Sequence, residues 1–142
     1  MKLEVNEILE DGNNYEEMYY DIIDFIQDIE LHDGFEKLTK GERSIYLIEK
    51  LVFEVNNGGF DQYIEDTEGE YTAETIGYLE DSGNLMLADL LKRAAKIYDT
   101  ETDENVVADQ LNILNDEFYD KIDYDEYYRM IIEYVKKSSE LF

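Results

Sequence analysis

A row of carboxylates recurs at helical spacing near the start of the chain, and its spacing suggests a chemistry. Its members are Glu17, Asp21, Asp24 and Asp28. On a helix this spacing places all four within about 60° of arc, with steps of about 4.5 to 6 Å along the axis. Those steps are similar to the distance between phosphates along one nucleic-acid strand. The row could therefore bind cationic groups arranged for DNA, although a solvated helix face is the simpler interpretation.

A second acidic group lies closer to the C-terminus. Its members are Asp116, Glu117, Asp120 and Asp123. They belong to the stretch 99–126, which carries eleven acidic residues and one lysine. Apolar residues are interleaved with these acids, which predicts a solvated helical face and not a disordered tail.

A pair of glycines raises the question of phosphate binding. They lie within Glu54-Val-Asn-Asn-Gly-Gly-Phe-Asp-Gln-Tyr63, and glycine loops at helix N-termini can aim backbone amides at an anion. Here no lysine or arginine follows, an acidic residue stands in the first turn, and the P-loop spacing is absent. We therefore interpret Gly58 as the left-handed residue that ends one helix, with Gly59 allowing the chain to turn. Phe60 and Tyr63 would then fold back onto the core.

The other residue types offer little for catalysis or metal binding. His32 is the one histidine, and at a helix end it more often complements the helix dipole than acts as a general base. The chain has no cysteine, and the acidic loop at 66–71 lacks the glycine position of a calcium-binding EF-hand. We expect no catalytic residue, no metal site and no cofactor, so the sequence does not predict an enzyme.

The net charge is the strongest feature of the composition. The 142 residues include 37 acidic and 12 basic side chains, for a formal net charge of −25. Direct binding to nucleic acid or to an anionic membrane is disfavoured, because both depend on basic residues. No apolar stretch approaches the length of a membrane span or of a secretion signal. We expect a cytoplasmic protein whose partners are basic.

The absence of proline and the repeated 3.6-residue spacing predict an all-α, single-domain bundle of about seven helices covering residues 1–142. The expected helices are 14–32, 39–57, 60–65, 72–81, 84–98, 103–114 and 123–141. The helix at 39–57 has only a narrow polar strip, which predicts a central buried helix. Thr39 with Glu42, and Asp123 with Glu126, have the spacing of N-terminal caps.

The basic residues form two islands. They are Lys37, Lys40, Arg43 and Lys50 in the first, and Lys92, Arg93 and Lys96 in the second. Each island could balance acids within the fold. Alternatively, each could meet an acidic face of a second copy, which would give a homodimer held by complementary charge.

Three stretches, at 54–63, 73–80 and 87–91, together resemble a family of small bacterial all-helical proteins that is catalogued as a domain of unknown function. The most specific part is the motif Asn-Gly-Gly-Phe-x-Gln-Tyr. Its residues here, with the preceding asparagine, are Asn56, Asn57, Gly58, Gly59, Phe60, Gln62 and Tyr63. The resemblance covers about 44–98, and the family includes an acidic DNA-mimic protein. It implies an all-helical fold and, for the mimic, a dimer whose acidic surface occupies the DNA-binding face of a transcription factor.

The leading hypothesis is a non-enzymatic acidic protein that imitates DNA for a basic partner, such as a transcription regulator or a nucleoid protein. The row at 17–28 is the first surface we expect it to use, and the group at 116–123 is the second. The alternative is an immunity-type protein that neutralises a basic toxin such as a nuclease. An enzyme would require a pocket with convergent polar groups and a shifted titratable pair.

Overall fold

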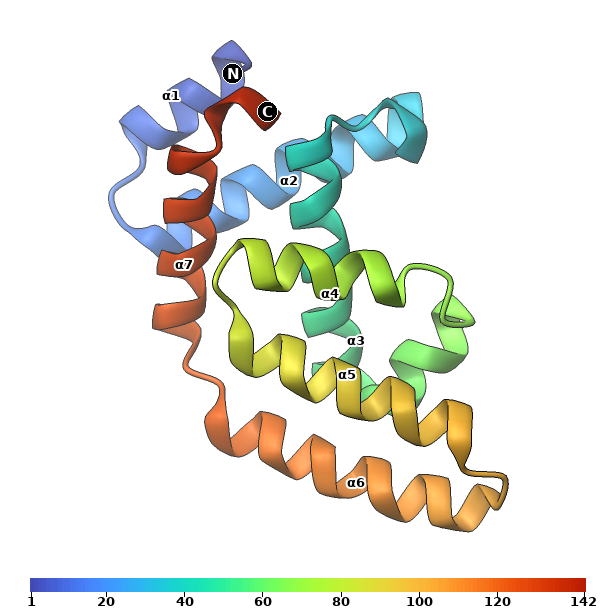
Figure 1. Cartoon of the computed structure of the whole chain (residues 1–142). Coiled ribbons are helices and arrows are strands. Elements are labelled where there is room, and N and C mark those ends of the chain that lie inside the picture. The colour runs from blue at the N-terminus through green and yellow to red at the C-terminus, as the bar shows by residue number, and fades with distance from the viewer. The chain divides into compact units, whose positions relative to one another are not determined.

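The computed structural model describes all 142 residues as α-helices, short 3-10 turns and connecting loops, with no β-strand (Figure 1). The helices are α1 (Leu3–Asp11), α2 (Tyr15–Asp33), α3 (Lys40–Thr67), α4 (Thr72–Asp81), α5 (Leu85–Thr100), α6 (Glu104–Lys121) and α7 (Tyr124–Lys137). The prediction of an all-α fold is confirmed. None of the helices combines the length and the apolar character that crossing a bilayer requires.

The contacts of the chain fall into two compact units. The first unit consists of Met1–Glu49 with Asp123–Phe142, and the second consists of Lys50–Ile122. Helix α3 contributes residues to both. The single domain expected for residues 1–142 stays a prediction, and its measurable consequence is the cooperativity of unfolding.

In the first unit, α2 packs against α7 (Figure 1). The face of α2 toward the core repeats every three or four residues, as the sequence predicts. Its buried members are Met18, Tyr19, Ile22, Ile23 and Ile26. The Tyr19 hydroxyl lies 2.9 Å from the hydroxyl of Tyr127, and the Tyr19 ring centroid lies 4.9 Å from that of Tyr128. A cluster of tyrosines therefore joins the two helices.

Helix α1 was not expected from the sequence. It has nine residues, and Val5 is its buried side chain, so its apolar pattern is short and weak. The contacts of α1 with α2 supply the packing that a helix of this length needs. The total of seven helices nevertheless agrees with the prediction, because the helices expected at 39–57 and 60–65 belong to one element, α3.

Both helix caps expected from the sequence are present. At the start of α3, the Thr39 N–H donates to Glu42 Oε1 at 2.9 Å, and the Glu42 N–H donates to Thr39 Oγ1 at 3.2 Å. At the start of α7, the Glu126 N–H donates to Asp123 Oδ1 at 3.2 Å. These bonds, reciprocal at α3 and single at α7, satisfy amides that have no partner inside a helix, which explains why each helix begins where it does.

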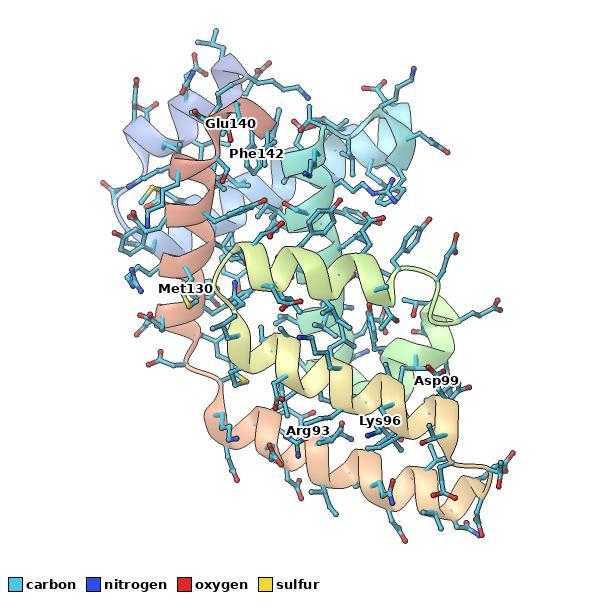
Figure 2. All side chains as sticks on the ribbon, in the orientation of Figure 1. Arg93, Lys96, Asp99, Met130, Glu140 and Phe142 are labelled. Atoms are coloured by element: carbon cyan, nitrogen blue, oxygen red, sulfur yellow. The ribbon has the colours of Figure 1, made fainter.

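The second unit is built around α5, which packs against α4 and against α6. Figure 2 shows Arg93 on the side of α5 that faces α6, where its guanidinium bonds Glu117 at 2.8 and 2.7 Å. The apolar residues of α5 recur at helical spacing and are buried. They are Leu87, Ala88, Leu90, Leu91 and Ala94.

Most of the apolar residues predicted for the buried helix at 39–57 are buried in α3. They are Ile45, Leu47, Ile48, Leu51, Val52 and Val55. The exceptions are Phe53, which is exposed over 60% of its surface, and Tyr46, which is half-buried. The projection of this segment placed apolar residues almost all round the helix, and it could not tell which of them faces solvent.

The left-handed residue of the paired glycines is Gly59 and not Gly58, so our interpretation of Gly58 was wrong. Gly59 has φ 83° and ψ −179°, and α3 resumes directly after it. Gly59 is not helical, so α3 consists of two helical segments that meet at a kink, in agreement with the separate helices expected at 39–57 and 60–65. At Gly58 a Cβ would overlap the side chain of Gln62, which would have to move away from its hydrogen bond with Glu54.

Candidate functional site

The acidic row lies on the solvent side of α2. Helix α2 begins at Tyr15, where the Asn14 side chain accepts from the Glu17 N–H at 2.9 Å. This cap fixes the register, and the buried face of the helix turns the row outward. All four predicted members are exposed: Glu17, Asp21, Asp24 and Asp28. The structure therefore brings them together on one surface.

The two ends of the row have local partners, whereas its centre has none. Glu17 Oε2 accepts from the backbone N–H of Asn13 at 3.3 Å and from its side-chain amide at 3.1 Å. Asp28 Oδ1 lies 3.2 Å from His32 Nδ1. The side chains of Asp21 and Asp24 make no hydrogen bond or ion pair within the chain. The central carboxylates are therefore available to an external cation.

His32 closes the C-terminal end of the row. Its Nδ1 donates to the backbone carbonyl of Asp28 at 2.9 Å. That hydrogen bond, together with the nearby Asp28 carboxylate, raises the pKa of His32. Both side chains are exposed, so this is the surface role expected of a histidine at a helix C-terminus.

The second acidic group is divided between structural roles. Glu117 binds the Arg93 guanidinium, and this hydrogen bonding lowers the pKa of Glu117 to about 2. Lys121 lies 3.3 Å from the same carboxylate. Asp123 caps α7 in the first unit, whereas Asp116 and Asp120 are exposed on α6 in the second. Two of the four predicted residues thus already serve the fold.

The glycine motif forms a bend that is held from a distant helix. The Phe60 N–H, at the bend in α3, donates to Asn115 Oδ1 on α6 at 2.9 Å. A Cβ at Gly59 would collide with the same asparagine side chain. Asn115 is buried, and its role could not be predicted from the sequence because it lies 55 positions from Phe60 with no local signal.

Other motif residues also bind within the second unit. Gln62 Nε2 donates to Glu54 Oε2 at 2.7 Å, and the Tyr119 hydroxyl donates to the Val55 carbonyl at 2.9 Å. Phe60 and Tyr63 are buried, and the Phe60 ring meets that of Phe118 edge-on at 6.3 Å. Backbone and side chains of the motif are occupied by the fold, which agrees with a structural role.

A family model for DMP19-like proteins matches residues 36–138. The chain belongs to the DMP19-like protein family. The resemblance seen in the sequence is thereby confirmed, and the match extends beyond the 44–98 region that carried it. No curated protein and no solved structure matches this chain.

The matched region of this DMP19-like chain includes the bend in α3, the second acidic group and most of α7, and it begins after α2. The acidic row at 17–28 therefore lies outside the part shared with the family model. Its assignment depends on its own exposure, spacing and lack of partners, and not on membership of the family.

A further titratable group of the DMP19-like chain lies in the tyrosine cluster of the first unit. Burial raises the pKa of Glu49 to about 7, although a hydrogen bond from Tyr127 partly opposes the rise. Burial and the nearby Glu49 carboxylate raise the pKa of Tyr127. Nowhere do three His, Asp or Glu side chains converge in a way that could hold a metal ion.

Proposed function

We propose that this chain is a non-enzymatic cytoplasmic protein that binds a basic DNA-binding protein by imitating the charge of DNA. Its membership of the DMP19-like family supports the proposal, because the family resemblance includes an acidic DNA mimic. The net charge of −25 also supports it, since so acidic a surface attracts and steers cationic partners.

The observation that carries the proposal is the unpaired centre of the acidic row. Asp21 and Asp24 are exposed, lie three residues apart on α2 and have no partner in the chain. Like charges at this spacing destabilise a helix by a few tenths of a kcal/mol per pair, and a lysine in the row would relieve that cost. Recognition by cationic side chains requires carboxylates that are not paired within the chain, and this surface provides them at a cost in helix stability.

The test reverses the charge of these two residues. Asp21→Lys with Asp24→Lys should abolish low-salt capture of DNA-binding proteins from a bacterial lysate, while the unfolding midpoint changes little. The matched control is Glu7→Lys with Glu10→Lys, which has the same spacing and charge change on the exposed side of α1. The control should retain capture. Equal loss in both variants would indicate that only total charge matters.

Competition separates mimicry from general acidity. The partner uses the same surface for DNA and for this chain. Duplex DNA should therefore release the captured protein at a far lower concentration of negatively charged groups than polyglutamate needs. If the two polyanions release the captured protein equally well, the proposal that this chain imitates DNA is wrong. If the captured protein is a nuclease whose activity the chain blocks, the immunity-type alternative replaces the regulator hypothesis.

We also propose a homodimer in which basic residues of one copy meet the acidic row of another. Lys50 and Lys92 lie 3.7 and 3.2 Å from carboxylates of their own chain, and Arg93 is likewise paired. Lys37 and Lys40 are exposed and have no such partner. Sedimentation should show a dimer at low salt that dissociates at high salt, and Lys37→Glu with Lys40→Glu should prevent it. A monomer at low salt would contradict this arrangement.

A further inference from the structure

The second unit has two hollows that share one lining residue, Tyr98 near the end of α5. One hollow has a volume of about 410 Å³ and the other about 290 Å³. These volumes lie at the low end of the range of roughly 300–1,000 Å³ seen for small-molecule sites. Tyr98 lines both hollows, and half of its surface is exposed.

The larger hollow is acidic at its rim and apolar at its base. Its carboxylates come from α3, from the loop after α5 and from α6, and they are Asp61, Glu65, Glu101 and Glu104. Val107, Ala108 and Leu111 of α6 supply the apolar surface. No lysine or arginine lines this hollow.

Lys96 on α5 is the basic residue nearest in sequence, and it is exposed and does not line the hollow. The next two basic residues bind carboxylates elsewhere. Lys92 binds Glu80 at 3.2 Å, and Arg93 binds Glu117. Both are on α5, yet neither neutralises the carboxylates around the larger hollow. The charge there remains available to a cation from outside, and the Tyr98 ring face can add a cation–π contact.

The smaller hollow has a different character. Its surface is mostly aliphatic or alanine, contributed by Ile64, Ala73, Ile76 and Ala95, and Asp99 is its one acidic residue. A surface that only imitated the phosphates of DNA would have no use for an apolar hollow. A ligand with a cationic group near an aliphatic group would fit the two hollows together.

We propose that the paired hollows bind an exposed segment of a protein in which an arginine neighbours a leucine or similar aliphatic residue. The guanidinium enters the acidic hollow and the aliphatic side chain enters the apolar one, with Tyr98 packed between them. Arginine suits this position because its planar guanidinium is weakly hydrated, stacks on aromatic rings and donates hydrogen bonds to carboxylates along its edge. The site is separate from the α2 row and does not depend on DNA mimicry.

The test uses the full-length ¹⁵N-labelled chain and three blocked dipeptides: acetyl-Leu-Arg-amide, acetyl-Leu-Gln-amide and acetyl-Ser-Arg-amide. The first should produce saturable chemical-shift changes at the amides around Tyr98. The other two should bind at least tenfold more weakly, because each fills only one hollow. Equal binding of all three, or shifts spread along the α2 row, would overturn the proposal. Spermidine binding as tightly as acetyl-Leu-Arg-amide would also overturn it, because the site would then select only charge.

Variants assign the effect to each hollow. Glu65→Gln with Glu104→Gln removes two exposed carboxylates of the acidic rim and should weaken acetyl-Leu-Arg-amide at least tenfold. Its matched control, Glu70→Gln with Asp109→Asn, removes two exposed carboxylates outside the hollow and should leave binding unchanged. Ala73→Trp should fill the apolar hollow and abolish the preference for leucine over serine. Unchanged binding in the first variant would refute the site.

The experiment is independent of the proposed function. Asp21→Lys with Asp24→Lys alters only the row on α2, so this variant should bind acetyl-Leu-Arg-amide as the unaltered chain does. Loss of lysate capture with retained peptide binding would leave the paired hollows as a distinct recognition site.

Discussion

The Lys2 ammonium donates two hydrogen bonds, at 2.9 and 2.7 Å, to the fully buried carboxylate of Glu42. The same carboxylate accepts the Thr39 N–H at the start of α3. One side chain thus closes the N-terminus of α3 and anchors the residue that precedes α1. Because Glu42 is shielded from water, its charge depends on Lys2 for compensation.

Lys2→Met should destabilise the protein by about 1–3 kcal/mol, because it leaves a buried carboxylate without its cation while retaining the apolar stem. The double variant Lys2→Met with Glu42→Gln should recover part of this loss. Urea unfolding of the four proteins of this cycle measures the coupling. If the double variant loses the sum of the unfolding free energies that the two single variants lose, the two side chains do not interact in solution.

The two glycines Gly59 and Gly77 should respond to alanine with opposite signs. At Gly59, φ is 83° and a Cβ would collide with Asn115, so Gly59→Ala should cost about 2 kcal/mol or more. At Gly77, in α4, a Cβ meets nothing within 4 Å, so Gly77→Ala should stabilise by about 0.5–1 kcal/mol. Thermal unfolding checks both. If Gly59→Ala left the unfolding temperature unchanged, the positive φ and the close contact with Asn115 at this bend would be contradicted.

Glu49 gives the first unit a specific dependence on pH. Its pKa is about 7 in the folded protein and near 4.5 in the unfolded chain. The folded protein retains a proton that the unfolded chain releases, so stability is greatest below the lower value and falls as pH rises to the higher one. The upward shift in the pKa of Glu49 corresponds to a loss of about 3 kcal/mol at most in the free energy of unfolding.

Replacement of Glu49 by glutamine should remove this dependence. Glu49→Gln should have little effect on the unfolding free energy at pH 4.5, and it should stabilise the protein by about 1–3 kcal/mol at pH 8. Glu7→Gln on α1 serves as the exposed control and should show no such difference. A constant effect of Glu49→Gln at both pH values would argue against the raised pKa.

The whole chain should unfold in one cooperative transition. Helix α3 contributes residues to both compact units, so loss of either unit removes packing from a helix that the other needs. Circular dichroism at 222 nm and tyrosine fluorescence should therefore give the same midpoint in urea. Two separated transitions would replace the single-domain prediction with two domains.

Local signals explain which parts of the fold could be predicted. The caps of α3 and α7 need only residues three positions apart, and the buried face of α2 follows from its own periodicity. Helix α1 was missed because its packing on other elements, and not its own pattern, makes it a helix.

The positions of the candidate site residues were predictable to a similar extent. Exposure of the α2 row followed from helical geometry, because the opposite face had to be buried. The ion pair of Glu117 with Arg93 joins two helices, and the bond of Asn115 to Phe60 spans 55 positions. Spacing within a segment carries no information on such pairs, so these roles needed the tertiary structure.

The lack of intrachain partners for Asp21 and Asp24 has a thermodynamic consequence. Mobile cations from the solvent must gather along α2 to offset its charge, as they condense along the backbone of DNA. A docking partner would return those ions to the bulk solution, and the gain in their entropy would drive association. In this respect α2 would resemble a nucleic acid in the ion atmosphere that it holds, as well as in the spacing of its charges.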